Sequence, residues 1–278
     1  MMRWRTCAWR TFSSCERKAK TGREGRQEMK EAILLAAYGG RETQERDSGL
    51  ALLRKEITER TGMTTALAYY NRALLAQTPE NAPEKQLRLL REISPEKLTV
   101  LPVFMTPGRT WTALRAQILA HRGDFAGLDV LPALLETEEN RERLARLLPD
   151  VFCVEAGERC LLIGHGAADE TDGLYLDLEQ RLRAAGMRGV SFALLHGAPG
   201  VRDILWLWDA GESRTVVLIP FLFAAGRHLM TDIAGEGDCA ASLLRAAGYR
   251  VDVRPRGLLD YPEVRRLLIA QLADKISI

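Results

Sequence analysis

The chain has 278 residues, of which 39 are Lys or Arg and 37 are Asp or Glu, so its formal net charge at pH 7 is only +2. This balance argues against a protein that wraps nucleic acid, because such proteins carry a strong excess of basic residues. The hydrophobic content of 46% is typical of a folded domain. The longest apolar run, 215–225, has the length of a strand and not of a membrane span. The cysteines lack the spacing of a disulfide framework, which indicates a protein of the reducing cytoplasm.

Residues 1–28 differ in composition from the rest of the chain. They contain eight basic and three acidic residues, show no regular apolar period and lack the apolar stretch of a secretory signal. Met29 is followed by two charged residues and then by a continuous apolar run, as at an ordinary protein start. We therefore interpret 1–28 as a disordered basic tail or a misassigned start, with an organellar transit peptide as the weaker alternative. Because this segment holds five more basic than acidic residues, the formal net charge without it falls from +2 to −3.

The remaining chain alternates short apolar runs with longer amphipathic segments. The apolar runs predict strands at 33–37, 65–69, 98–103, 127–131, 160–164, 189–194, 215–222 and 249–255. The amphipathic segments predict helices at 42–61, 83–93, 110–121, 137–148, 171–185, 200–210, 239–247 and 262–275. This alternation is typical of an α/β fold with parallel sheets and helices on both faces. Strands that are apolar throughout fit burial on both sides.

An internal repeat divides the chain. The segment 34–39 reads Leu-Leu-Ala-Ala-Tyr-Gly, and the segment 161–166 reads Leu-Leu-Ile-Gly-His-Gly. A second pair, 102–110 and 220–228, shares the pattern Pro, five residues, Gly-Arg and a polar residue. Both halves therefore carry a first strand that ends in a ring residue and Gly, and a later strand that ends near a Gly-Arg pair.

The repeat predicts two similar Rossmann-like lobes, each a parallel sheet flanked by helices. We expect an N-terminal lobe over 29–150 and a C-terminal lobe over 151–278, with a boundary near Pro149. Ligands of such folds bind at the carboxyl ends of the strands. The sequence therefore predicts a cleft between the lobes, lined by the repeated segments.

The histidines are unevenly placed. His121 ends a helical pattern, where a structural or solvent-facing role is expected. His165, His196 and His228 each lie at or shortly after the carboxyl end of a predicted strand, and such ends converge in a parallel sheet. Three imidazoles at one edge suit a borderline transition metal, and they also suit proton transfer. The alternative is that each histidine only caps its strand, but the shared position favours a common site.

Two segments resemble a known family. The segment 162–166 reads Leu-Ile-Gly-His-Gly, and 219–235 reads Ile-Pro, five residues, Gly-Arg-His, three residues and Asp-Ile-Ala-Gly. Together they resemble the anaerobic-pathway sirohydrochlorin cobaltochelatases, which are ATP-independent class II chelatases related in fold to ferrochelatase. The part from His228 to Gly235 is the more specific. The resemblance extends over 29–278 and includes shorter matches at 98–102, 107–108, 248–249 and 257–258.

The resemblance implies a cleft that holds a tetrapyrrole and a pair of histidines that bind the metal and receive the pyrrole protons. The pair corresponds to His165 and His228. The family's third ligand is the acid of a Glu-Gly pair, where this chain has His196-Gly197. Three neutral imidazoles favour Co²⁺ first, and also Ni²⁺, Fe²⁺ or Zn²⁺, as the divalent metal. No nucleotide is expected, because the sequence has no G-x-x-x-x-G-K-[ST] loop.

Sirohydrochlorin carries acetate and propionate arms, so the resemblance also implies cationic binding residues. Arginine binds carboxylates in a bidentate manner, and aromatic rings can form apolar walls for the flat macrocycle. The predicted substrate-binding residues are Tyr38, Arg41, Arg72, Arg109, Thr110, Trp111 and Arg227. The alternatives are solvated surface charges for the arginines and plain core for the aromatic residues. Asp232 is predicted either to orient His228 through a hydrogen bond or to cap a helix.

We therefore expect an enzyme that inserts Co²⁺ into sirohydrochlorin in anaerobic cobalamin biosynthesis. Two alternatives stay open at this point. One is a non-catalytic protein that carries or senses a metal or a haem-like metallo-tetrapyrrole, and the other is a chelatase whose metal is Ni²⁺ or Fe²⁺. No nucleic-acid or membrane partner is expected, and the resemblance is compatible with a homo-oligomer.

Overall fold

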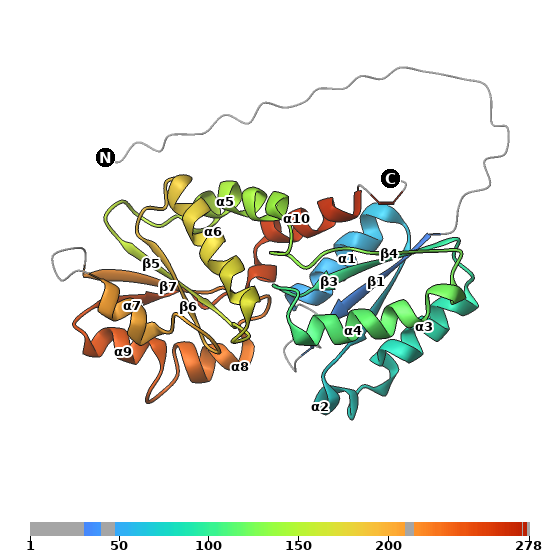
Figure 1. The fold of residues 1–278 in the computed structure, drawn as a ribbon, viewed down its shortest axis with the longest axis horizontal. Helices are drawn as coiled ribbons and strands as arrows, with labels where there is room; N and C mark the ends of the chain where they lie inside the picture. Colours follow the sequence, from blue (N-terminus) through green and yellow to red (C-terminus); the bar gives the residue numbers. More distant parts are fainter. Residues whose placement is uncertain (1–30, 40–47, 209–213, 274, 277–278) are drawn as a thin grey trace, which may run out of the picture.

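The computed structural model describes residues 31–39, 48–208, 214–273 and 275–276. The predicted tail, 1–28, and Arg41 lie outside these residues. Two four-stranded sheets lie side by side with helices around both, and every strand pairing within them is parallel (Figure 1). This arrangement confirms the predicted α/β class with two similar lobes.

The two sheets share one topology. Their strands are β1 (Glu31–Ala37), β2 (Thr64–Tyr69), β3 (Lys97–Val103), β4 (Gly127–Val130), β5 (Arg159–Gly164), β6 (Val190–Leu194), β7 (Thr215–Pro220) and β8 (Arg250–Val253). The spatial order is β2-β1-β3-β4 in the first sheet and β6-β5-β7-β8 in the second. Each first strand therefore lies between the second and third strands of its half, which is the structural form of the sequence repeat.

Helices follow most of the strands. They are α1 (Gly49–Thr61), α2 (Arg72–Leu75), α3 (Pro83–Glu92), α4 (Arg109–Ala120), α5 (Glu138–Phe152), α6 (Gly173–Ala184), α7 (Val201–Leu207), α8 (Gly226–His228), α9 (Ala240–Ala246) and α10 (Pro262–Ala273). Ser48 and Thr137 start α1 and α5, because their hydroxyl oxygens accept hydrogen bonds from backbone N–H groups of the first turn. The short helices α2 and α8 were not predicted. None of the described helices is both long and apolar enough to cross a membrane.

Successive residues of each central strand face different helix layers. Leu34 packs in a cluster with α3 and α4, whereas Leu35 belongs to a cluster that continues through α5, α6 and α10 to the second sheet. In that sheet Leu162 joins the same shared cluster, and Leu161 packs with α7 and α9. All four side chains are fully buried. Burial on both faces explains why these strands are apolar throughout.

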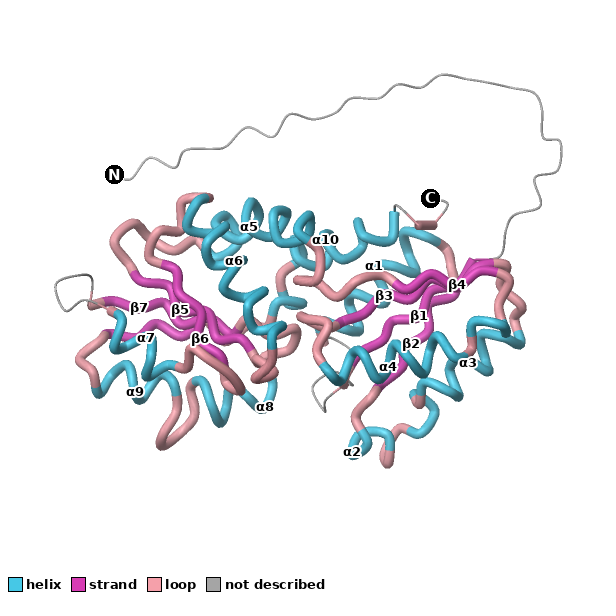
Figure 2. The backbone as a smooth tube through the Cα atoms, viewed as in Figure 1, coloured by secondary structure: helices cyan, strands magenta, loops and turns pink. Residues whose placement is uncertain are grey.

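The last helix of each half packs on the other half (Figures 1 and 2). Helix α5 lies along α6, and α10 returns to α1 and also contacts α5. The apolar face of α5, which includes Leu144 and Leu148, is buried in the cluster that joins the two sheets. The boundary predicted near Pro149 falls inside α5. The ranges 29–150 and 151–278 therefore share one buried cluster, and their division into two lobes stays a prediction.

Asp177→Asn is expected to weaken the packing of α5 on α6. In the wild type, Oδ2 of Asp177 accepts hydrogen bonds from Nε of Arg141 in α5, at 2.5 Å, and from Nε of Arg181 in α6, at 2.7 Å. Burial opposes ionisation, but the bonds from Arg181 and Arg141 outweigh it and lower the pKa of Asp177 below 3.8. Because the carboxylate is partly exposed, we expect a loss of about 1 kcal/mol in the free energy of unfolding at pH 7.

Urea unfolding at two pH values tests this contact. A carboxyl group whose pKa is lowered by folding stabilises the protein above its unfolded pKa, and this stabilisation disappears as the pH falls through the folded pKa. The difference between Asp177→Asn and the wild type should therefore be largest near neutral pH and shrink below about pH 4. Glu139→Gln, which removes an ion pair within α5 alone, is the matched control and should have a smaller effect. Equal effects of the two variants would contradict the expectation.

Candidate metal centre

Three of the four histidines meet at the carboxyl ends of neighbouring strands. His165 directly follows β5, His196 lies two residues after β6, and His228 ends α8, the helix that follows β7. Because β5 lies between β6 and β7, their ends bring the three side chains together. The ring centroids are 4.8 Å apart for His165–His196, 5.1 Å for His165–His228 and 6.4 Å for His196–His228. His121 lies in the other half, where its Nδ1 is 2.8 Å from a carboxylate oxygen of Asp124.

Two of the imidazoles have a defined tautomer. Nδ1 of His165 lies 2.9 Å from the carbonyl oxygen of Gly166, and Nδ1 of His228 lies 2.7 Å from Oδ2 of Asp232. A carbonyl or carboxylate oxygen only accepts, so Nδ1 carries the proton in both rings. The lone pair is then on Nε2, which is the atom that can bind a metal or receive a proton.

The surroundings favour a neutral His165 beside an ionised Asp232. Crowding by neighbouring groups desolvates the ring and lowers the pKa of His165 below 6.5, against the opposing hydrogen bond to Gly166. At pH 7 this imidazole is therefore neutral. Burial also opposes the charge on Asp232, but hydrogen bonds from His228 and Thr231 outweigh burial and lower the pKa of Asp232 below its ordinary value. Of the two roles predicted for Asp232, the structure shows the hydrogen bond to His228.

The cluster is open to solvent and is not a closed metal site. His165 and His196 are exposed, and His228 is half-buried. Among the described residues, no group of three His, Cys, Asp or Glu side chains is arranged to hold a metal ion as it stands. The rings of His196 and His228, which are the furthest apart, must approach each other before all three imidazoles can bind one ion.

Three predicted substrate-binding residues of the N-terminal half lie around one cavity. Tyr38, Arg72 and Thr110 line a hollow of about 620 Å³ together with Tyr70 and Asn71. The Tyr38 side chain is 54% exposed and therefore available to a ligand. Sequence reasoning did not identify Tyr70 and Asn71 as lining residues, although they directly precede Arg72 in the chain.

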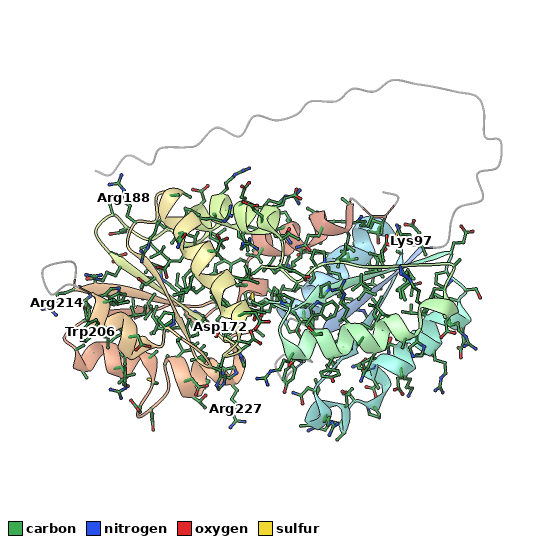
Figure 3. All side chains as sticks on the ribbon, viewed as in Figure 1. Lys97, Asp172, Arg188, Trp206, Arg214 and Arg227 are labelled. Carbon is green, nitrogen blue, oxygen red and sulfur yellow. The ribbon has the colours of Figure 1, made fainter. Side chains whose placement is uncertain are left out.

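The two arginines of the repeat are exposed, each at the end of a short loop that follows a strand. Arg109 is the first residue of α4, and Arg227 lies in α8 beside His228. Figure 3 shows Arg227 extending from the body of the protein toward solvent. Neither guanidinium forms an ion pair with another of the described residues. Arg41 lies outside the part of the chain that the structure describes.

Trp111 is a core residue, and its predicted role as a wall of the cleft is wrong. Its side chain is 1% exposed and stacks on Phe104 with ring centroids 5.3 Å apart. Together with Leu114 and Ile118 it forms the apolar stripe of α4 that packs against the first sheet. A residue at this helical spacing from two buried aliphatic residues faces the core.

Asp172 is a buried charged residue that the sequence analysis missed. It is 7% exposed, precedes α6 and binds the loop that follows His165. The sequence signal, Asp-Glu-Thr-Asp at 169–172 ahead of an amphipathic segment, indicates only the start of a helix.

Comparison with known proteins places this fold and site in context. A family model described as cobalt chelatase (CbiK) matches residues 31–277. Sirohydrochlorin cobaltochelatase CbiKC of Nitratidesulfovibrio vulgaris is 29% identical over 262 residues, which cover 89% of this chain and 91% of that protein.

Solved structures show the same fold. SirB from Bacillus subtilis with Fe³⁺ superposes with a TM-score of 0.66 and 15% identity over 88% of this chain and 95% of SirB. The sirohydrochlorin chelatase SirB of Bacillus subtilis subspecies spizizenii in complex with cobalt gives a TM-score of 0.61 and 14% identity, again over 88% and 95%.

Proposed function

This chain belongs to the cobalt chelatase (CbiK) family, and from this premise we propose that it inserts Co²⁺ into sirohydrochlorin at the three histidines. The enzyme is a metal chelatase, in keeping with its sirohydrochlorin cobaltochelatase relative. The observation that carries the proposal is the meeting of His165, His196 and His228 at three adjacent strand ends, with ring centroids 4.8 to 6.4 Å apart. Imidazole nitrogens are ligands that Co²⁺ accepts readily.

In the proposed reaction the same histidines hold the metal and then take up protons. Insertion exchanges two pyrrole N–H protons of the macrocycle for one divalent ion, so two protons must go to bases. Nδ1 is already committed to Gly166 in His165 and to Asp232 in His228. Each ring therefore offers one lone pair, on Nε2. The metal has to leave Nε2 before a pyrrole proton can bind there. The affinity of the site for the metal must therefore be only moderate. The open arrangement of the cluster supports such binding.

The macrocycle is proposed to lie between the histidines and the N-terminal half. Its carboxylate arms would bind the exposed guanidinium groups of Arg72, Arg109 and Arg227, because such groups bind carboxylates in a bidentate manner. Tyr38, at the 620 Å³ cavity, would provide an aromatic contact for the ring. Arg41 is also proposed to bind the macrocycle, because it lies three residues after Tyr38 in the sequence.

A metal panel tests the proposed function and the role of His196. Loss of sirohydrochlorin fluorescence is followed with Co²⁺, Ni²⁺ and Fe²⁺, for the wild type and for His196→Glu. We expect the wild type to insert Co²⁺ most efficiently. The variant should have a KM for Co²⁺ that is higher by about tenfold, because a carboxylate is a harder ligand than imidazole. Absence of insertion with all three metals would reject the proposal, and identical KM values would remove His196 from the metal site.

A further inference from the structure

Asp172 binds the loop that carries His165 without being part of the imidazole cluster. Its Oδ1 accepts a hydrogen bond from the N–H of Ala167, at 2.8 Å, and its Oδ2 accepts one from the N–H of Ala168, at 3.1 Å. The carboxylate is buried, and a buried charge is tolerated only where hydrogen bonds replace its water. Figure 3 shows Asp172 on the side of the C-terminal half that faces the N-terminal half.

The same loop is tied to the loop that carries His196. The N–H of His196 donates to the carbonyl oxygen of His165, at 2.7 Å, and the N–H of Ala168 donates to the carbonyl oxygen of His196, at 3.1 Å. The Ala168 N–H is therefore shared between the His196 carbonyl and Asp172. The Asp172 carboxylate thus binds the backbone at Ala167 and Ala168, the segment that links the His165 loop to the His196 loop.

The backbone between the His165 and His196 loops is closely packed and holds a strained residue. Ala168 has a φ of +53°, a left-handed conformation that non-glycine residues rarely adopt. A Cβ at Gly197 would collide with Oδ2 of Asp172, and a Cβ at Gly166 would collide with the His196 carbonyl. Such close packing transmits a displacement of the carboxylate directly to both loops.

We propose that Asp172 is a positioning residue whose carboxylate sets the separation of the His165 and His196 imidazoles, and so the affinity of the site for its metal. The inference rests on the proposed function of those histidines. Without the carboxylate, the N–H of Ala167 loses its partner and Ala168 is free to leave its strained conformation. Metal sites tolerate only small displacements of their ligands, so this movement weakens binding.

Titration of the apo-protein with Co²⁺ alone tests the proposal through the visible ligand-field spectrum. In Asp172→Asn one oxygen still accepts, but the amide NH₂ faces the second backbone N–H. We expect the Kd for Co²⁺ to rise by about tenfold, with a changed absorption band. In the insertion reaction the KM for Co²⁺ should rise while the KM for sirohydrochlorin stays unchanged. A residue needed only for folding would not change the band or separate the two KM values.

Asp169→Asn is the matched control, because it changes a carboxylate of the same loop. The Asp169 carboxylate accepts hydrogen bonds from the backbone N–H and the hydroxyl of Thr171, whereas the N–H groups of Ala167 and Ala168 donate to Asp172. Its Co²⁺ spectrum and Kd should equal those of the wild type. If Asp172→Asn also equals the wild type, the inference is overturned and the proposed function stands. If the Co²⁺ spectrum of the wild type does not depend on His165, both the proposed function and the inference that rests on it are rejected.

Gly197→Ala provides a second route that keeps the carboxylate in the protein. The added Cβ would collide with Oδ2 of Asp172 and displace the carboxylate, so the same rise in Kd and the same change in the band are expected. Thermal unfolding of each variant identifies those that fold. If neither Asp172→Asn nor Gly197→Ala folds, Asp172 is a general stability residue and the positioning role is rejected.

Discussion

His165→Ala is expected to lower the rate of Co²⁺ insertion at least about 100-fold, the effect typical of removing a positioned acid–base group. His165 lies at the centre of the cluster, 4.8 Å from His196 and 5.1 Å from His228 between ring centroids. Its removal therefore takes away both a proposed metal ligand and a proposed proton acceptor. Desolvation of the ring by neighbouring groups lowers the pKa of His165 below 6.5, so the lone pair on Nε2 is available at neutral pH.

Loss of sirohydrochlorin fluorescence measures this effect, and His121→Ala is the matched control. His121 is also a histidine, but it ends α4 in the N-terminal half and contacts Asp124. We expect His121→Ala to insert Co²⁺ at the wild-type rate. Thermal unfolding should show that both variants are folded, since the His165 side chain is exposed. An unchanged rate in His165→Ala would reject the assigned site.

The strands could be predicted from the sequence, but the partners of the last helices could not. Continuous apolar runs such as 160–164 identify strands buried on both faces, and every predicted strand is present. The amphipathic pattern of α5 shows that one face must be buried, but it does not show which surface covers it. In the structure that surface belongs to α6, which connects β5 and β6 of the second sheet. The proline at 149 suggested a boundary, yet α5 continues past it to Phe152.

The histidine cluster could be predicted because strand ends of a parallel sheet converge, whatever the details of the loops. The environment of individual side chains could not be predicted in the same way. Trp111 follows the strand end closely enough to suggest a place in the cleft, but its spacing to Leu114 and Ile118 turns it to the core. Asp172 was missed because its contacts are made to backbone N–H groups four and five residues earlier, which no spacing of side chains reveals.

Asp232→Ala is expected to weaken Co²⁺ insertion by about 10- to 100-fold, the range for residues that orient a metal-binding histidine. Asp232 accepts the Nδ1 proton of His228 at 2.7 Å and also binds the hydroxyl of Thr231 at 2.8 Å. Without the carboxylate, the His228 ring can rotate and can place its proton on Nε2, which removes the lone pair from the site. Asp232→Asn should have a smaller effect, because the amide oxygen can still accept from Nδ1.

A double-mutant cycle separates this orienting role from a direct one. If Asp232 acts only through His228, adding Asp232→Ala to His228→Ala should not lower the insertion rate further. Asp238→Ala, which removes an exposed carboxylate paired with Arg202, is the control and should leave the rate unchanged. A further loss in the double variant would mean that Asp232 contacts the metal or the macrocycle itself. The Co²⁺ spectrum of Asp232→Ala would then change even in the background that lacks His228, whereas an orienting residue has no effect there.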